Sequence, residues 1–192
     1  MRYRGPEKSY ISDIDYEGRN QEEELKISTE AEQAVLNFLK KNFPDDAVRR
    51  ATEKEDSGEF GENKSSQAID IVLSKVKKKR DVPSLVQQVT TGKSLETMQK
   101  KMKEMQERPF VRLEGMSLDD VAAPKTLIFL EPELIKRLRN PNDLEAKKEL
   151  DEKVVGSSIN SLKFALLKTK NPKEQALAKD WLEIFEKIKK NS

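Results

Sequence analysis

Five basic residues within one hexapeptide have the chemistry to contact phosphate: Lys75, Lys77, Lys78, Lys79 and Arg80. Cationic side chains neutralise the phosphates of nucleic acid and release counterions, so binding of this kind weakens as salt rises. Residues 63–112, which contain the cluster, carry a net charge of +7, and no aromatic residue lies between Phe60 and Phe110 to stack on bases. We therefore predict that nucleic acid bound here is held nonspecifically through its backbone. The alternatives are a nuclear-import signal and a solvated helix end.

A second phosphate-related pattern is the segment TTGKS at residues 90–94, which ends like the phosphate-binding loop G-x-x-x-x-G-K-[ST]. In such a loop, backbone N–H groups surround the phosphates and the lysine reaches the outer ones. The apolar run 127–130 with Glu131 after it also resembles a strand whose terminal acid holds the water of a magnesium ion. Against this, Gln87 stands where the first glycine belongs. A degenerate P-loop NTPase is the remote alternative for function, and a glycine helix stop followed by a serine cap is the simpler interpretation.

A narrow apolar seam marks the helix that we predict over residues 94–108. It consists of Leu95, Met98, Met102 and Met105. The spacing of three, four and three places these residues on one line of a helix. Methionine is flexible and suits an adaptable contact surface. We predict that this seam binds a protein partner or a second copy of the chain; packing into a core is the alternative.

The composition narrows the chemistry. The chain of 192 residues contains no histidine and no cysteine, so it lacks the commonest general base, the commonest zinc ligand and any thiolate. We therefore predict no catalytic residues, no cofactor and no metal site. Because no apolar run approaches ~20 residues and residues 1–6 (MRYRGP) precede no apolar segment, we predict neither a membrane span nor a secretory signal. The expected location is intracellular, either cytoplasmic or nuclear.

The clearest predicted element is a helix over residues 172–190. Asn171 can cap its first turn, and Leu177, Trp181, Ile184 and Ile188 recur at spacings of four, three and four. An apolar face this wide needs cover on two sides, which predicts a helical bundle. Further helices are predicted over residues 29–43, 66–79, 85–91, 143–155 and 158–170. Pro132 fits the first position of another helix, which continues to Leu138. Residues 127–130 fit either a strand or a helix.

The elements and charges divide the chain into three parts. Residues 1–27 show no helical period and are expected to be a disordered acidic tail. Residues 28–112 are expected to be a helical, basic middle region, with self-association as one of its predicted roles. Residues 113–192 form a C-terminal helical bundle. The predicted fold class is mainly α, with a flexible acidic N-terminal region. In this organisation the chain resembles phosphoproteins of negative-strand RNA viruses and scaffolding proteins.

These observations favour a non-enzymatic adaptor or assembly subunit that binds protein partners. The alternative is a nucleic-acid-binding accessory protein that uses the basic region 63–112. The seam supports the first interpretation and the lysine cluster supports the second.

Overall fold

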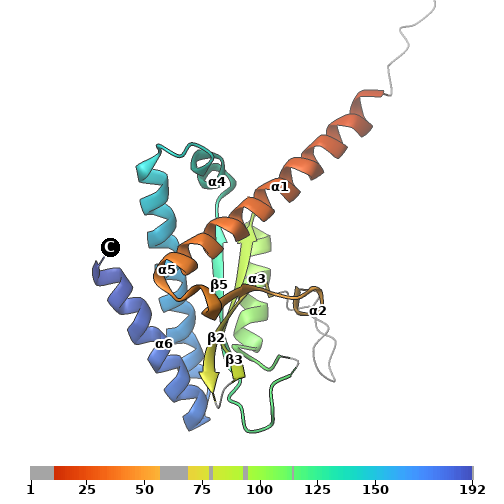
Figure 1. The fold of residues 1–192 in the computed structure, drawn as a ribbon. Helices are drawn as coiled ribbons and strands as arrows, with labels where there is room; N and C mark the ends of the chain where they lie inside the picture. Colours follow the sequence, from red (N-terminus) through yellow and green to blue (C-terminus); the bar gives the residue numbers. More distant parts are fainter. Residues whose placement is uncertain (1–10, 57–68, 78–79, 93–94, 114, 192) are drawn as a thin grey trace, which may run out of the picture.

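The computed structural model describes residues 11–56, 69–77, 80–92, 95–113 and 115–191. Along the chain its elements are α1 (Ile11–Asn42), the short 3-10 helix η1 (Asp45–Ala47), β1 (Val48–Arg50), α2 (Glu53–Asp56), β2 (Ile71–Lys77), β3 (Arg80–Thr91), α3 (Leu95–Glu107), β4 (Phe110–Val111), β5 (Ala123–Leu130), α4 (Pro132–Leu138), α5 (Leu144–Lys168) and α6 (Pro172–Asn191). Figure 1 shows α5 and α6 side by side against a sheet, with α1 running across it and out of the body of the protein.

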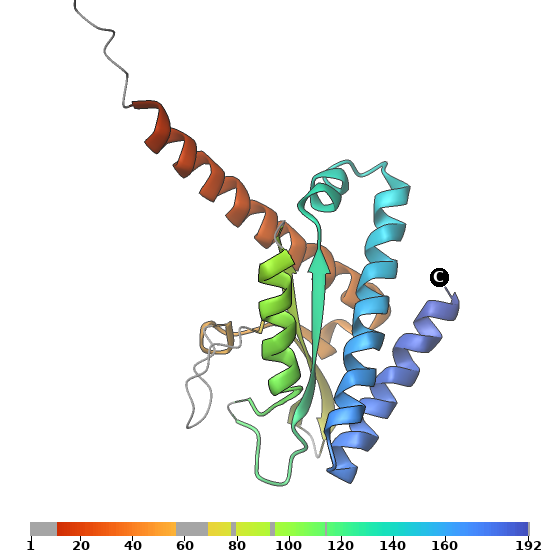
Figure 2. The same cartoon turned by 180° about the vertical axis from the view of Figure 1, so that it is seen from behind.

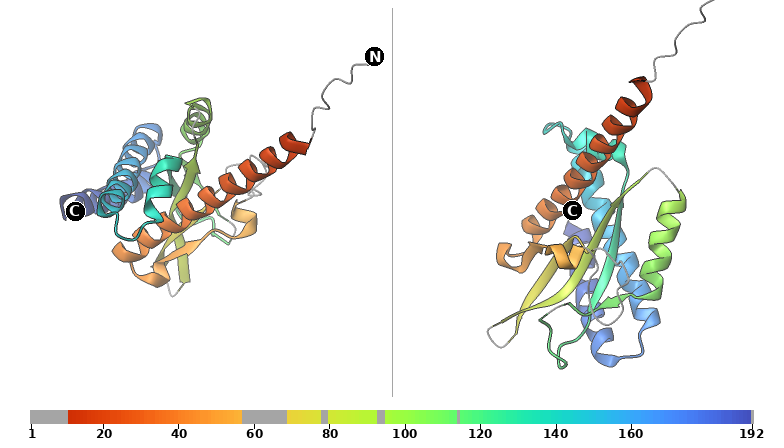
Figure 3. Two further views of the ribbon diagram at one scale, coloured as in Figure 1. Left: turned by 90° about the horizontal axis from the view of Figure 1, so that it is seen from above. Right: turned by 90° about the vertical axis from the view of Figure 1, so that its right-hand side faces the viewer.

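The centre of the fold is a five-stranded sheet in the order β1-β2-β3-β5-β4. Strands β1, β2 and β3 pair antiparallel, β3 pairs parallel with β5, and β4 pairs antiparallel with β5. Because parallel neighbours need a crossover, the chain passes from β3 to β5 through α3 and β4. Figure 2 shows α3 beside β5, and Figure 3 shows α1 and α3 on different sides of the strands. The sheet is therefore covered by helices on both faces.

The sheet overturns the fold class expected from the sequence. The prediction of a mainly α chain with a C-terminal helical bundle is wrong, because the chain forms a curled mixed sheet and its segment 113–192 supplies the inner strand β5. The flexible acidic N-terminal region is also wrong from Ile11 onward, where α1 begins. Residues 1–10 lie outside the described part. The helices α3, α4 and α6 lie where the sequence predicted helices.

The hairpin β2–β3 replaces two predicted helices, and its local sequence explains why. Residues 71–73 form an unbroken β-branched and apolar run, Ile-Val-Leu, which packs on both faces of a sheet as readily as on one face of a helix. The alternation is visible in the packing, since Ile71 and Leu73 join one hydrophobic cluster while Val72 joins the other. Pro83 does not end the strand, because the register shifts beside it in a β-bulge where Ser84 donates to the carbonyl of Leu73 at 3.3 Å.

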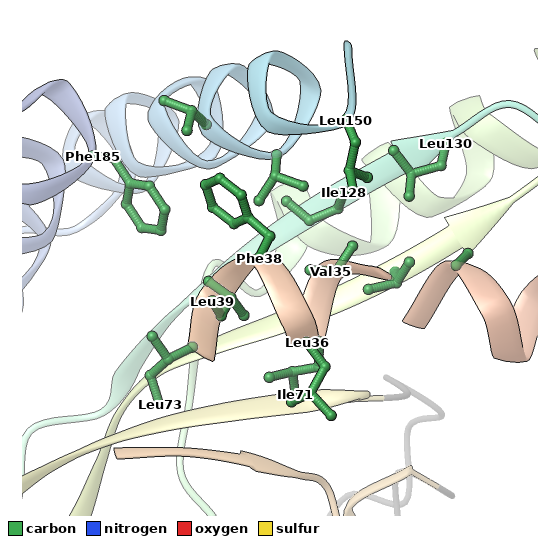
Figure 4. Close-up of a cluster of buried hydrophobic side chains, with 14 of the residues drawn as sticks. Val35, Leu36, Phe38, Leu39, Ile71, Leu73, Ile128, Leu130, Leu150 and Phe185 are labelled. Atoms are coloured by element: carbon green, nitrogen blue, oxygen red, sulfur yellow. The ribbon is translucent and has the colours of Figure 1, made fainter. Parts of the chain in front are cut away.

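The main hydrophobic core fills the space between the sheet and helices α1, α5 and α6. Figure 4 shows side chains of α1, including Leu39, beside Leu73 and Ile128 of the sheet and Phe185 of α6. Phe43 stacks edge-on against Trp181, with ring centroids 5.6 Å apart. The cluster thus joins residues of the predicted middle region 28–112 to residues of the region 113–192 within one interior.

Helix α5 packs on the sheet through a buried face that includes two serines. It continues through Gly156, where the sequence predicted a break, so one helix replaces two. Ser158 and Ser161 are both buried, and the Ser161 hydroxyl accepts a hydrogen bond from the Leu127 backbone N–H at 3.2 Å. The Ser161 hydroxyl therefore supplies the hydrogen-bond acceptor for a backbone N–H of β5 that the short neighbouring strand β4 does not reach.

Candidate functional site

The seam on α3 is divided between the interior and the surface. Met105 is buried, Met98 is half-buried and Met102 is 42% exposed. The side chain of Leu95 lies outside the described part. One end of the seam therefore packs into the fold, and among its described side chains Met98 and Met102 are accessible to a partner. The prediction that these residues bind a partner stays a prediction.

The basic cluster lies on the β2–β3 hairpin instead of at a helix end. Lys77 and Arg80 are paired across the two strands, and Lys78 and Lys79 lie outside the described residues. The Lys75 ammonium is 3.7 Å from the carboxylate of Asp180 and stands 5.3 Å from the ring centre of Trp181. These contacts tie Lys75 to α6, so it is not a freely solvated cation.

The TTGKS segment follows a strand and precedes a helix, as a phosphate-binding loop does, because β3 ends at Thr91 and α3 begins at Leu95. Lys93 and Ser94 lie outside the described residues. Glu131 follows β5, and its carboxylate forms an ion pair with Lys153 at 2.8 Å. The NTPase interpretation stays a prediction.

The most unusual group of the interior lies beneath α3. Lys125 on β5 is fully buried, and its Nζ atom has no hydrogen-bond partner among the described residues. Backbone geometry places it there: side chains alternate along a strand, so Lys125 faces the same side as Ala123 of the smaller hydrophobic cluster, away from Ile128 of the main core. Buried lysine is rare unless it is paired, because removing an ammonium from water costs several kcal/mol.

Polar residues from three elements surround this lysine. Val86 is the direct neighbour of Lys125 on β3, so Gln88, two residues further, lies on the same face. Gln88 is buried, and its side-chain oxygen Oε1 has no hydrogen-bond partner among the described residues. The Asp70 carboxylate accepts a hydrogen bond from the Val89 backbone N–H at 2.5 Å. We call Asp70, Gln88 and Lys125, with Lys101 and Glu104 of α3, the Lys125 site.

Burial and nearby charges act together on the Lys125 ammonium. Its pKa is lowered from 10.5 to about 8, and burial is the largest cause. The positive charge of Lys101 contributes to this lowering, whereas the carboxylates of Glu104 and Asp70 oppose it. Lys101 itself forms an ion pair with Glu104 at 3.4 Å. Lys125 is therefore predominantly a buried ammonium at pH 7, with hydrogen-bond donors to offer.

This buried ammonium predicts a measurable pH dependence of stability. The folded state releases the Lys125 proton near pH 8 and the unfolded state near pH 10.5. Between these values the unfolded state binds more protons, so the free energy of unfolding should rise with pH, by about 3 kcal/mol in total. Lys125→Met should be more stable than the native chain at pH 7, and this difference should shrink from pH 8 to 10.5. Urea unfolding of both proteins across this range tests it; a difference that is independent of pH would contradict it.

A second buried glutamine, Gln87, lies on the opposite face of β3, where it faces α5. Gln87 is fully buried toward α5, and its side-chain nitrogen donates to the Ser158 hydroxyl at 3.2 Å. Gln87 and Gln88 are therefore neighbours in sequence that serve separate faces of the sheet. Gln88 and Lys125 were not predicted as site residues, because Gln and Lys normally indicate solvent-exposed positions. The signal in the sequence that could have indicated these buried polar residues is their position within otherwise apolar strands.

Comparison of the chain with protein-family models, curated proteins and solved structures found no match. In the part of the chain that the structure describes, no group of three or more acidic residues is placed to hold a metal ion. Within the same residues, no helix combines the length and apolarity needed to cross a bilayer.

Proposed function

We propose that this chain is a non-enzymatic nucleic-acid-binding protein, and that Lys125 contacts a phosphate of the nucleic-acid backbone. The observation that carries this proposal is the buried Lys125 ammonium without a hydrogen-bond acceptor among the described residues. A phosphate oxygen supplies both the negative charge and the acceptor that this group lacks. Perturbed titratable groups of this kind concentrate at functional sites.

The surface above Lys125 suits a polyanion. Lys100 and Lys103 are exposed on α3, and Lys101 is 27% exposed between them and the interior. Helix α3 packs mainly on β5, and it covers Lys125. Contact with a phosphate therefore requires α3 to move away from the sheet, with the exposed lysines attracting the polyanion first.

The test is a pair of charge-matched variants. Lys125→Met should weaken binding of a ~20-nucleotide single strand by about 10- to 100-fold, because hydrogen bonds to charged groups contribute about 1.5–3 kcal/mol. It should also lower the salt slope of the binding constant by about one. Lys148→Met, which removes a lysine that is 74% exposed on α5, is the control and should change binding little. Fluorescence anisotropy at several salt concentrations measures both quantities.

An unchanged affinity and salt slope for Lys125→Met, together with the increased stability expected above, would show that Lys125 is an interior lysine without a ligand. Thermal unfolding of each variant establishes that the compared proteins are folded.

A second candidate function is a non-enzymatic adaptor or assembly subunit that binds protein partners. It is supported by Met102, which is 42% exposed on α3 beside the half-buried Met98. Both proposals place the protein inside the cell, in the cytoplasm or nucleus.

Met98→Lys with Met102→Lys should abolish self-association without lowering the unfolding midpoint. Light scattering measures the mass, and Leu167→Lys, at a position that is 84% exposed on α5, is the control. Equal masses for all three proteins would count against this surface.

A further inference from the structure

A second unsatisfied atom at the Lys125 site carries information about the ligand. The Gln88 side-chain oxygen is buried on the same face of the sheet as Lys125, and it accepts no hydrogen bond within the described part. The ammonium needs an acceptor, whereas this oxygen needs a donor. A ligand that satisfies both presents an anionic oxygen and a hydroxyl or N–H group close together.

We infer that the site selects RNA over DNA: Lys125 donates to a backbone phosphate, and Gln88 Oε1 accepts a hydrogen bond from the 2′-hydroxyl beside it. This inference rests on the proposed nucleic-acid binding. The backbone of DNA carries phosphates but no donor next to them, whereas each ribose adds a 2′-hydroxyl adjacent to the phosphate. A buried amide oxygen that stays unsatisfied is costly, so DNA leaves the site incomplete.

The strand register supports this division of roles. Gln88 is the direct neighbour of Leu127 on β5, and Lys125 is the direct neighbour of Val86 on β3. The two polar side chains are therefore diagonal neighbours on adjacent strands, and Asp70 lies just before the next strand, β2. Lys125 and Gln88 both stand on strands and not on loops, so once α3 has moved away from the sheet, a phosphate and the sugar next to it can be read by one fixed pair of groups.

The chain offers a matched control in Gln87. It is also fully buried, and its side-chain oxygen is likewise without a partner among the described residues, but it lies on the α5 face and donates to Ser158. Gln88→Met and Gln87→Met remove the same atoms from adjacent positions. Only the first change removes the acceptor from the Lys125 site.

The experiment compares three single strands of identical sequence: RNA, DNA and fully 2′-O-methylated RNA. The native chain should bind RNA about tenfold more tightly than the other two, because one hydrogen bond is lost in each. The methylated strand keeps the ribose oxygen but cannot donate, so it separates the hydrogen bond from the shape of RNA. Gln88→Met should bind all three alike, and Gln87→Met should keep the preference. Fluorescence anisotropy measures the affinities, and thermal unfolding verifies folding.

Equal affinity of the native chain for RNA and 2′-O-methylated RNA overturns the inference, and this arm needs no variant. A preference that survives Gln88→Met, or that Gln87→Met also abolishes, overturns it as well. If binding depends on Lys125 but does not distinguish the strands, the proposed function stands and the RNA selectivity fails. If no strand binds, both fail.

Discussion

Residues 113–192 expressed alone are expected to remain largely unfolded, although the sequence predicts a separate helical bundle there. The segment contains β5, which pairs along residues 125–130 with β3 from the other part of the chain. Without β3, the backbone groups of β5 on that side lose their partners, and Ile128 and Leu130 lose the apolar side chains that cover them. Helix α1 and Phe43, which directly follows it, are lost too, and the loss of Phe43 exposes the parts of Phe185 and Trp181 on which it now packs.

Circular dichroism and the emission of Trp181, the only tryptophan of the chain, measure this result. The full chain should unfold in urea in one cooperative transition that both signals follow. The fragment should show emission typical of exposed indole before any urea is added. A cooperative and coincident transition of the fragment would show instead that residues 113–192 fold independently, as the predicted domain boundary requires.

The second large effect is a loss of stability when a buried leucine of α5 is replaced by alanine, and an exposed leucine of the same helix provides the control. Leu162 is fully buried in the region between the sheet and α6, whereas Leu167, five residues later, is 84% exposed. Leu162→Ala should lower the free energy of unfolding by about 2–5 kcal/mol, because it removes apolar contacts and leaves a cavity. A domain has only about 5–15 kcal/mol in total, so this variant should be marginally folded. Leu167→Ala should change stability by less than about 0.5 kcal/mol.

Urea titrations followed by circular dichroism compare the two variants in the same helix. Both replacements change helix propensity equally, so their difference reports burial alone. Similar effects of the two variants would show that α5 does not face the sheet as described. That result would also remove the basis for the close contact between Ser161 and β5.

The Lys125 site links stability to the proposed function. A buried ammonium lowers the stability of the folded chain unless an anion satisfies it. Lys125→Met is therefore expected to stabilise the protein and to weaken its binding of nucleic acid. This combination is typical of binding sites, where a residue is kept for its ligand at the expense of folding free energy. A residue with only a structural role would not separate the two measurements in this direction.

The sequence by itself predicted the helices whose apolar residues recur at helical spacing and whose remaining residues are polar. Helix α6 is the best case: Trp181 and Phe185 are buried on one side, while Lys189 and Lys190 occupy its last turn. The start of α4 at Pro132 and the extent of α3 follow from the same local signals. These elements are predictable because their pattern reflects burial on one face only.

Only the tertiary structure decided the sheet and the site. The run at residues 71–73 is apolar on every side, so its period does not distinguish a strand from a helix; pairing with β1 and β3 made it a strand. A helix was predicted to begin at residue 29, but α1 continues through Thr29, whose hydroxyl donates to the Leu25 carbonyl. Lys125 and Gln88 become neighbours through a parallel register between segments almost 40 residues apart, both are buried, and α3 packs on the strand that carries Lys125. Whether a lysine is buried depends on which elements pack over it in the tertiary structure, and the local sequence pattern does not predict this.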